Sequence, residues 1–215
     1  MRSLNIISMK SPIHFVRIIA FLALTQLAFV ACAPKRGNDE PCGFVRNGSN
    51  YRVSWKYNVP IKIQMHSSVP TEFKPAILSA MKRWENLSER EFFLVDQIDN
   101  RDYPGARDSK NVIYWNHTWL EESPRRQAVT VIHWNNSTIS EGDILINAKD
   151  FEYSTAASAD YNKVDFESLM VHEFGHLLGL THQDSSTGVM APMLGYGVIR
   201  REPSKDLVPL LSCEY

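Results

Sequence analysis

The chain has 215 residues and a formal net charge of −1 at pH 7, with 44% hydrophobic and 22% charged residues. This balance is typical of a soluble globular protein with a core, and it excludes disordered and fibrous classes. The first 31 residues hold three basic side chains and no acid, so the rest of the chain carries a formal charge of −4. Because nucleic-acid binding proteins carry basic patches, we expect no nucleic-acid partner.

The first 31 residues have the pattern of a signal peptide. A basic stretch ending at Arg17 precedes an apolar run from Ile18 to Ala31, which is short for a membrane span. The sequence LAFVAC that ends at Cys32 resembles a bacterial lipobox, in which the cysteine is lipidated and becomes the new N-terminus. We therefore expect a lipoprotein held on a bacterial membrane, the outer membrane in a Gram-negative cell.

Two alternatives for this segment stay open. Cleavage after Ala33, in the pattern Ala31-Cys32-Ala33, would release a secreted protein, and an uncleaved segment would itself be the anchor. All three cases place the folded part outside the cytoplasm.

One folded domain is expected over residues 51–215, because residues 32–50 are rich in proline, glycine, asparagine and charge and are typical of a tether. Alternation at Ile61, Ile63 and Met65 predicts a first strand. A helix should begin at Thr71 and Glu72, since apolar residues then recur at three and four positions. Runs rich in aromatic and β-branched residues predict four more strands, at 92–95, 112–115, 128–134 and 143–146.

The next helix carries the most informative residues. We expect it over residues 166–180, with Asp165 capping its first turn. His172 and His176 are one helical turn apart, so their imidazoles project from one face and can bind a single metal ion. Glu173 can reach a water on that metal without being a ligand.

The chain should reverse direction directly after these histidines. Gly179 stands where a sharp turn needs a residue that tolerates positive φ. The reversal lets His182 return as a third nitrogen ligand and leaves a fourth position for water or substrate, as in catalytic zinc sites. Nitrogen ligands suit zinc best, so we predict one catalytic zinc ion.

The sequence HEFGHLLGLTH, from His172 to His182, resembles the zinc signature of the metzincin metallopeptidases. The sequence GVMAP around Met190 resembles their methionine turn, with the spacing of the matrixin branch. By this resemblance Met190 forms an apolar floor beneath the histidines without binding the metal, and Pro192 belongs to the same turn. The resemblance implies an α+β, metzincin-like fold: a five-stranded mixed twisted sheet, two long helices and a C-terminal helix near residues 204–211.

Two further metal sites of the family are not carried over. His117 and His133 lack the spacing of the second, structural zinc site. Asn147 and Asp150 fall where calcium ligands would lie, but the glycine-rich partner loop is missing, so calcium stays open and is not predicted. Tyr196 is a candidate wall of the specificity pocket.

These residues predict a zinc-dependent endopeptidase that hydrolyses extracytoplasmic proteins or peptides with metal-activated water. Glu173 would take the proton of that water and pass it to the leaving amine. By resemblance, the strand at 128–134 would border the cleft and pair with an extended substrate.

One alternative is a membrane-tethered, non-catalytic binding module that contains zinc, which the intact Glu173 disfavours. Another is a peptidase that trims short peptides. The sequence predicts no oligomeric state.

The three cysteines require an explanation in an oxidising compartment. With Cys32 lipidated, Cys42 and Cys213 remain, and a disulfide between them would tie the tether to the last helix. Alternatively, Pro41-Cys42-Gly43 resembles the matrixin cysteine switch, in which a thiolate occupies the fourth zinc position. We favour the disulfide, because the arginine and the Pro-Asp pair of that switch are absent.

Overall fold

The computed structural model describes residues 43–96, 107–119 and 125–215, and the expected signal peptide, Cys32 and Cys42 lie outside these ranges. The elements up to residue 147 are, in chain order, β1 (Ile61–Met65), the 3₁₀ helix η1 (Thr71–Phe73), α2 (Lys74–Ser88), β2 (Phe93–Val95), β3 (Asn111–Asn116), β4 (Ala128–Asn135) and β5 (Thr138–Asn147). They are followed by β6 (Tyr153–Ser154), β7 (Val164–Asp165), α3 (Phe166–Leu177), the 3₁₀ helix η2 (Lys205–Leu207) and α4 (Val208–Ser212).

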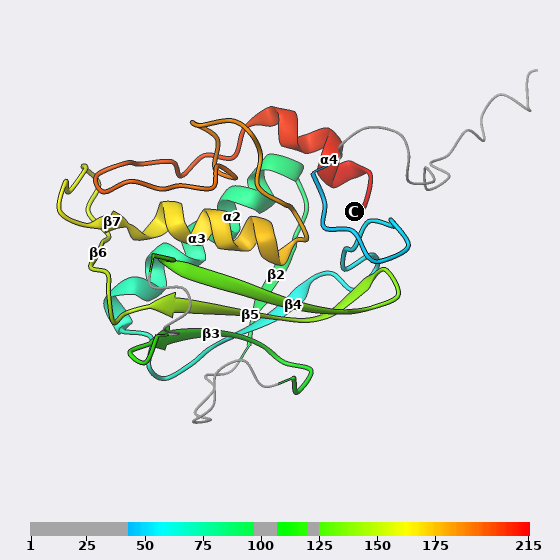
Figure 1. Ribbon diagram of the computed structural model, residues 1–215, viewed down its shortest axis with the longest axis horizontal. Helices are drawn as coiled ribbons and strands as arrows, with labels where there is room; N and C mark the ends of the chain where they lie inside the picture. Colours follow the sequence, from blue (N-terminus) through cyan, green and yellow to red (C-terminus); the bar gives the residue numbers. More distant parts are fainter. Residues whose placement is uncertain (1–42, 97–106, 120–124) are drawn as a thin grey trace, which may run out of the picture. The chain divides into compact units, whose positions relative to one another are not determined.

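Five of these strands form one mixed sheet in the order β2-β1-β3-β5-β4. Neighbouring strands are parallel except β4, which lies at the edge and pairs antiparallel with β5. The helices α2 and α3 pack against each other on one face of this sheet (Figure 1). The α+β class and the five-stranded mixed sheet expected from the sequence are therefore confirmed.

The two long helices approach closely around Gly175 of α3. Trp84 of α2 is fully buried, and its indole Nε1 donates a hydrogen bond of 2.8 Å to the Val171 carbonyl. A Cβ atom added to Gly175 would lie 2.3 Å from the Met190 sulfur and 2.9 Å from the Trp84 ring. Only glycine permits this packing, because an added methyl group would overlap both neighbours.

The predicted helix boundaries were wrong at two places. The first α-helix begins at Lys74, and the Thr71 side chain makes no capping hydrogen bond, because residues 71–73 form a 3₁₀ turn ahead of the proline in the first α-helical turn. The second helix ends at Leu177 instead of Leu180, because Gly179 has φ of +95° and cannot continue a helix.

Part of the expected tether packs on the domain. Phe44 is 4% exposed and forms an antiparallel bridge with Leu180, and Arg46 forms one with Arg52. The folded part therefore begins before Tyr51, although the proline- and glycine-rich composition of residues 32–50 had indicated a tether. Cys213 is exposed, and its expected disulfide partner lies outside the described residues.

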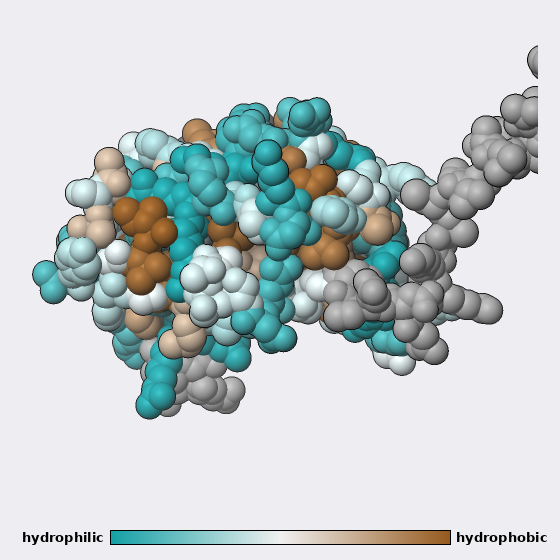
Figure 2. Space-filling view, turned by 90° about the horizontal axis from the view of Figure 1, so that it is seen from above, coloured by the Kyte–Doolittle hydropathy of each residue, from teal (hydrophilic) through white to brown (hydrophobic). Residues whose placement is uncertain are grey.

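The surface is mostly hydrophilic on the face shown in Figure 2, where apolar side chains gather in separate patches. Apolar residues with exposed side chains include Met193, at 77%, and Ile199, at 40%. Separate apolar residues of this kind are normal on soluble proteins.

Buried charges fix the start of α3 to the C-terminal segment. Asp165 is 5% exposed, accepts a 2.9 Å hydrogen bond from the Ser168 amide and pairs with the Arg201 guanidinium. The Arg200 amide donates to the Ser168 hydroxyl at 2.7 Å. Burial acts to raise the pKa of Asp165, but the hydrogen bonds from Arg201 and Ser168 outweigh it and lower the pKa.

We predict that Asp165→Asn destabilises the zinc-free protein by about 1–3 kcal/mol at pH 7, the range for losing hydrogen bonds to a charged group. A lowered folded-state pKa stabilises the fold above the ordinary carboxyl pKa of about 4, and this advantage disappears as pH falls through the lowered value. Urea unfolding at pH values from 7 to 2 measures the free energy of unfolding of the zinc-free wild type and of Asp165→Asn, with the exposed Glu91→Gln as control. A difference between wild type and Asp165→Asn that stays constant over this range would contradict the assignment.

Candidate metal centre

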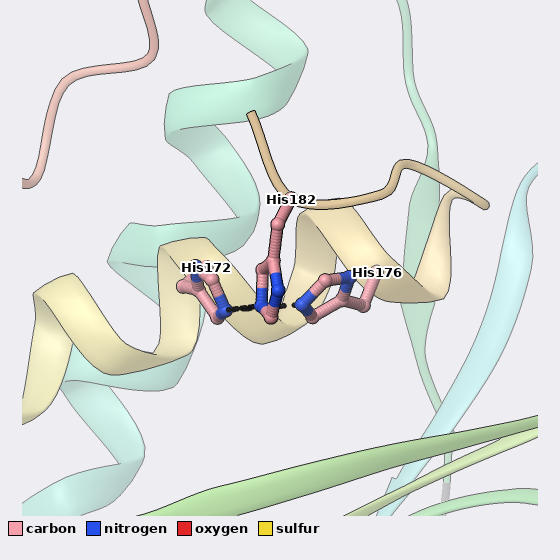
Figure 3. A group of neighbouring side chains, drawn as sticks. All are labelled: His172, His176 and His182. Carbon is pink, nitrogen blue, oxygen red and sulfur yellow. Dashed lines mark hydrogen bonds between the residues drawn. The ribbon is translucent and has the colours of Figure 1, made fainter. Parts of the chain in front are cut away.

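Three histidines converge at the C-terminal half of α3 (Figure 3). α3 supplies His172 and His176, and the turn after it supplies His182. The Nε2 atom of His172 lies 3.0 Å from that of His176 and 3.3 Å from that of His182. The three side chains, which are up to ten positions apart in the sequence, therefore each direct one nitrogen to a common point.

The other ring nitrogens fix the tautomers of the two helical histidines. Nδ1 of His172 lies 2.7 Å from the Val189 carbonyl, and Nδ1 of His176 lies 2.8 Å from the Leu180 carbonyl. A carbonyl only accepts, so Nδ1 carries the proton and Nε2 of each neutral ring presents a lone pair. Two such lone pairs cannot form a hydrogen bond with each other, whereas a cation between them satisfies both.

The spacing and chemistry of these donors fit zinc. Tetrahedral zinc with Zn–N bonds of about 2.0–2.1 Å places its nitrogen ligands about 3.3 Å apart, close to the distances of 3.0 and 3.3 Å found here. Burial lowers the pKa of His176 and of His182, and the neighbouring imidazole adds to the shift in each. Both rings are thus held neutral near pH 7, the form that binds a metal.

A buried carboxylate stands next to this centre. Glu173 of α3 is 4% exposed, and its Oε2 atom accepts a 2.5 Å hydrogen bond from the hydroxyl of Thr130 in β4. The same hydroxyl lies 3.2 Å from the Glu173 carbonyl oxygen. We did not identify Thr130 from the sequence. The alternation of β4 could have placed it on one face, but nothing local pairs it with a helix 43 residues away.

The methionine turn packs against α3 next to the histidines. Met190 is fully buried, and its sulfur is close to Gly175 on α3. Its carbonyl accepts a 2.9 Å hydrogen bond from the Gln183 amide, next to His182. The turn therefore holds the helix on one side and the chain of the third histidine on the other.

A cleft with a cavity of about 480 Å³ opens beside the histidines. The edge strand β4 forms one side, and the segment from Ala191 to Leu194, which contains Pro192, forms another. Tyr196 does not line this cavity and is half exposed beside Phe151, so it is not a wall of this cleft.

The other sequence candidates lie outside the centre. His133 is 4.0 Å from the buried Glu141, its neighbour across β4 and β5. The Asn147 side chain donates to Asp150 at 3.1 Å and accepts from the backbone of the same turn. The side chain of Asn147 is thus committed to hydrogen bonds within the protein, and His117 is exposed directly after β3.

The N-terminal segment Gly43–Val45 holds the turn that carries His182. The Val45 amide donates to the Gly179 carbonyl at 2.8 Å, and the Thr181 amide and hydroxyl donate to the Gly43 carbonyl at 2.6 and 3.1 Å. A Cβ added to Gly179 would lie 2.5 Å from the Val53 carbonyl oxygen, so the turn is also closely packed from below. These contacts restrict the position of the third histidine.

The three histidines form a group that could hold a metal ion, and the comparison with known families agrees. Residues 53–206 match the sequence profile of Peptidase_M10, Matrixin. The match covers well over half of the chain, and the protein belongs to the matrixin family of zinc metallopeptidases. A comparison with curated proteins gave no match.

We predict that Thr181→Val weakens zinc binding about 2- to 10-fold, the equivalent of one lost hydrogen bond of about 0.5–1.5 kcal/mol. Thr181→Ser keeps the hydroxyl and should bind zinc like the wild type. Competition with a chromophoric chelator measures the affinity, and thermal unfolding of the zinc-free proteins shows whether the fold is affected. Equal zinc affinity of Thr181→Val and wild type would show that the bond to Gly43 does not position His182.

Proposed function

We propose that the protein is a zinc-dependent endopeptidase that hydrolyses peptide bonds of proteins outside the cytoplasm. The observation that carries the proposal is the placement of the buried Glu173 carboxylate beside three convergent imidazole nitrogens, at the side of an open cleft. Three protein ligands leave a further position free, which distinguishes catalytic from structural zinc sites. Membership of the matrixin family supports the same chemistry.

His172, His176 and His182 would hold the zinc ion, which supplies a Lewis acid that activates water and polarises the scissile carbonyl. Glu173 accepts the proton of the attacking water and then donates it to the leaving amine. The Thr130 hydroxyl occupies one of the two carboxylate oxygens, Oε2, and leaves the other available for the proton. This bond also fixes the orientation of the carboxylate relative to β4.

The edge strand supports an extended polypeptide as substrate. β4 is hydrogen-bonded to β5 along one side, and its residues from Ala128 to Thr130 and Ile132 line the cleft. An extended peptide can add to such an edge through main-chain hydrogen bonds, which do not depend on its sequence. This mode of binding suits internal segments of unfolded proteins and favours an endopeptidase over an enzyme that trims chain ends.

We predict that Glu173→Gln keeps one zinc per chain and lowers turnover of an unfolded protein by about 10²–10⁴-fold, the usual contribution of a general base. A zinc chelator should abolish turnover by the wild type, and added zinc should restore it. The matched control is Glu152→Gln, whose carboxylate is 78% exposed.

Two outcomes would contradict this function. Loss of zinc from Glu173→Gln would make the carboxylate a ligand. A wild-type protein that binds zinc yet cleaves no protein or peptide would favour the non-catalytic binding module.

We also propose that a lipid on Cys32 holds the enzyme on a bacterial membrane, outside the cytoplasm. The support is the apolar run from Ile18 to Ala31 and the sequence LAFVAC, which includes the end of this run and finishes at Cys32. Within residues 43–96, 107–119 and 125–215, no helix combines the length and the apolar character needed to cross a bilayer.

Metabolic labelling with a fatty acid in a bacterial host tests this anchor. We predict that the wild type and Cys213→Ser are labelled and sediment with membranes, whereas Cys32→Ser is neither labelled nor processed. Wild-type protein found unlabelled in the medium would establish a secreted enzyme instead.

A further inference from the structure

Four hydrogen bonds fix the chain just before β4. The Arg126 carbonyl accepts from the Asn147 side chain at 3.0 Å, and the Gln127 carbonyl accepts from the Asn147 amide at 2.9 Å and from the Tyr153 hydroxyl at 2.8 Å. The Gln127 side chain donates to the Leu194 carbonyl at 2.8 Å and so joins the two sides of the cleft. Asn147 is fully buried and Tyr153 is 6% exposed. Buried polar groups therefore determine where this short segment lies.

Two arginines project from this fixed segment. Arg125 and Arg126 both line the cavity beside the histidines, and both are exposed to solvent. None of the ion pairs among the described residues involves either guanidinium. Among residues 43–96, 107–119 and 125–215, Glu173 is the only carboxylate that lines the same cavity, and it accepts a hydrogen bond from Thr130. One end of the cleft therefore carries two cations that form no ion pair with any described carboxylate.

We infer that the cleft selects polypeptides with an acidic side chain on one side of the cleaved bond, and that Arg125 and Arg126 recognise it. This inference rests on the proposed endopeptidase function and names its substrate class. Guanidinium groups bind carboxylates through paired hydrogen bonds, so aspartate and glutamate are the natural partners. The remaining described lining is largely apolar, so the arginines are the charged contacts that this part of the molecule offers to an acidic side chain of a substrate.

The position of the acidic residue follows from the strand. Thr130 contacts Glu173, so the cleaved bond lies near Thr130 when a peptide follows β4. Arg126 precedes Thr130 by four residues, a distance of at most about 14 Å at ~3.4 Å per residue of extended chain. An arginine side chain spans part of this distance. The preferred acid should therefore stand about two to four residues from the cleaved bond, on one side only.

Cleavage of a library of proteome-derived peptides first locates the bond and the preferred residues. Peptide pairs that differ only by Glu or Gln at the enriched position then give the ratio of their kcat/KM values. We predict a ratio of about 3–10 in favour of Glu for the wild type, as expected for two partly exposed ion pairs. The ratio should approach one for Arg125→Gln/Arg126→Gln and decrease with added salt.

A matched control removes the same charge elsewhere. Lys62 and Lys110 are exposed and do not line the cavity, so Lys62→Gln/Lys110→Gln should keep the wild-type ratio. Loss of the ratio in this control would indicate a general effect of net charge and would overturn the inference. The same conclusion follows if acidic residues are not enriched, or if they stay enriched in the arginine variant.

A binding measurement separates this inference from the proposed function. Fluorescence anisotropy gives the affinity of the Glu and Gln peptides for zinc-loaded Glu173→Gln, with and without the two arginine substitutions. Tighter binding of the Glu peptide that depends on the arginines supports the inference even if the wild type cleaves nothing. Equal binding of both peptides overturns it, whether or not the wild type is an active peptidase.

Discussion

Three imidazole nitrogens directed at one point constrain the chain segments around them. Their Nε2 atoms lie 3.0 and 3.3 Å apart, a spacing that costs free energy unless a cation stands between them. The carbonyls of Val189 and Leu180 hold two of the rings in the required tautomer. Leu180 follows the turn at Gly179, and Val189 precedes the buried Met190. Both carbonyls therefore belong to chain segments that themselves pack against α3.

Packing around the centre and chemistry within it use the same elements. Gly175 lets Met190 and Trp84 approach α3, while β4 supplies both the Thr130 hydroxyl to Glu173 and one side of the cleft. The sheet edge therefore orients the carboxylate and borders the space where a substrate can lie. Because one strand has both roles, a peptide paired with β4 would be aligned with Glu173 and the histidines without a separate positioning device.

The parts of this arrangement that depend on local spacing could be predicted from the sequence. The one-turn separation of His172 and His176, the capping by Asp165 and the reversal at Gly179 each depend on a few consecutive residues. Contacts between distant segments could not be predicted. Nothing near Phe44 indicates its bridge to Leu180, and nothing near Thr130 indicates its bond to Glu173. The early end of α3 was missed because apolar periodicity continues past the point where the backbone turns.

X-ray absorption spectroscopy at the zinc edge, on protein purified without chelators, shows whether the three histidines hold a zinc ion with one position open to water. We expect one zinc per chain with three nitrogen neighbours at about 2.0–2.1 Å and an oxygen in the remaining position. Simultaneous replacement of His172, His176 and His182 should remove this spectrum. A zinc-free protein would rule out this site, and so would a sulfur neighbour at about 2.3 Å, because Cys42 would then fill the position assigned to water and substrate.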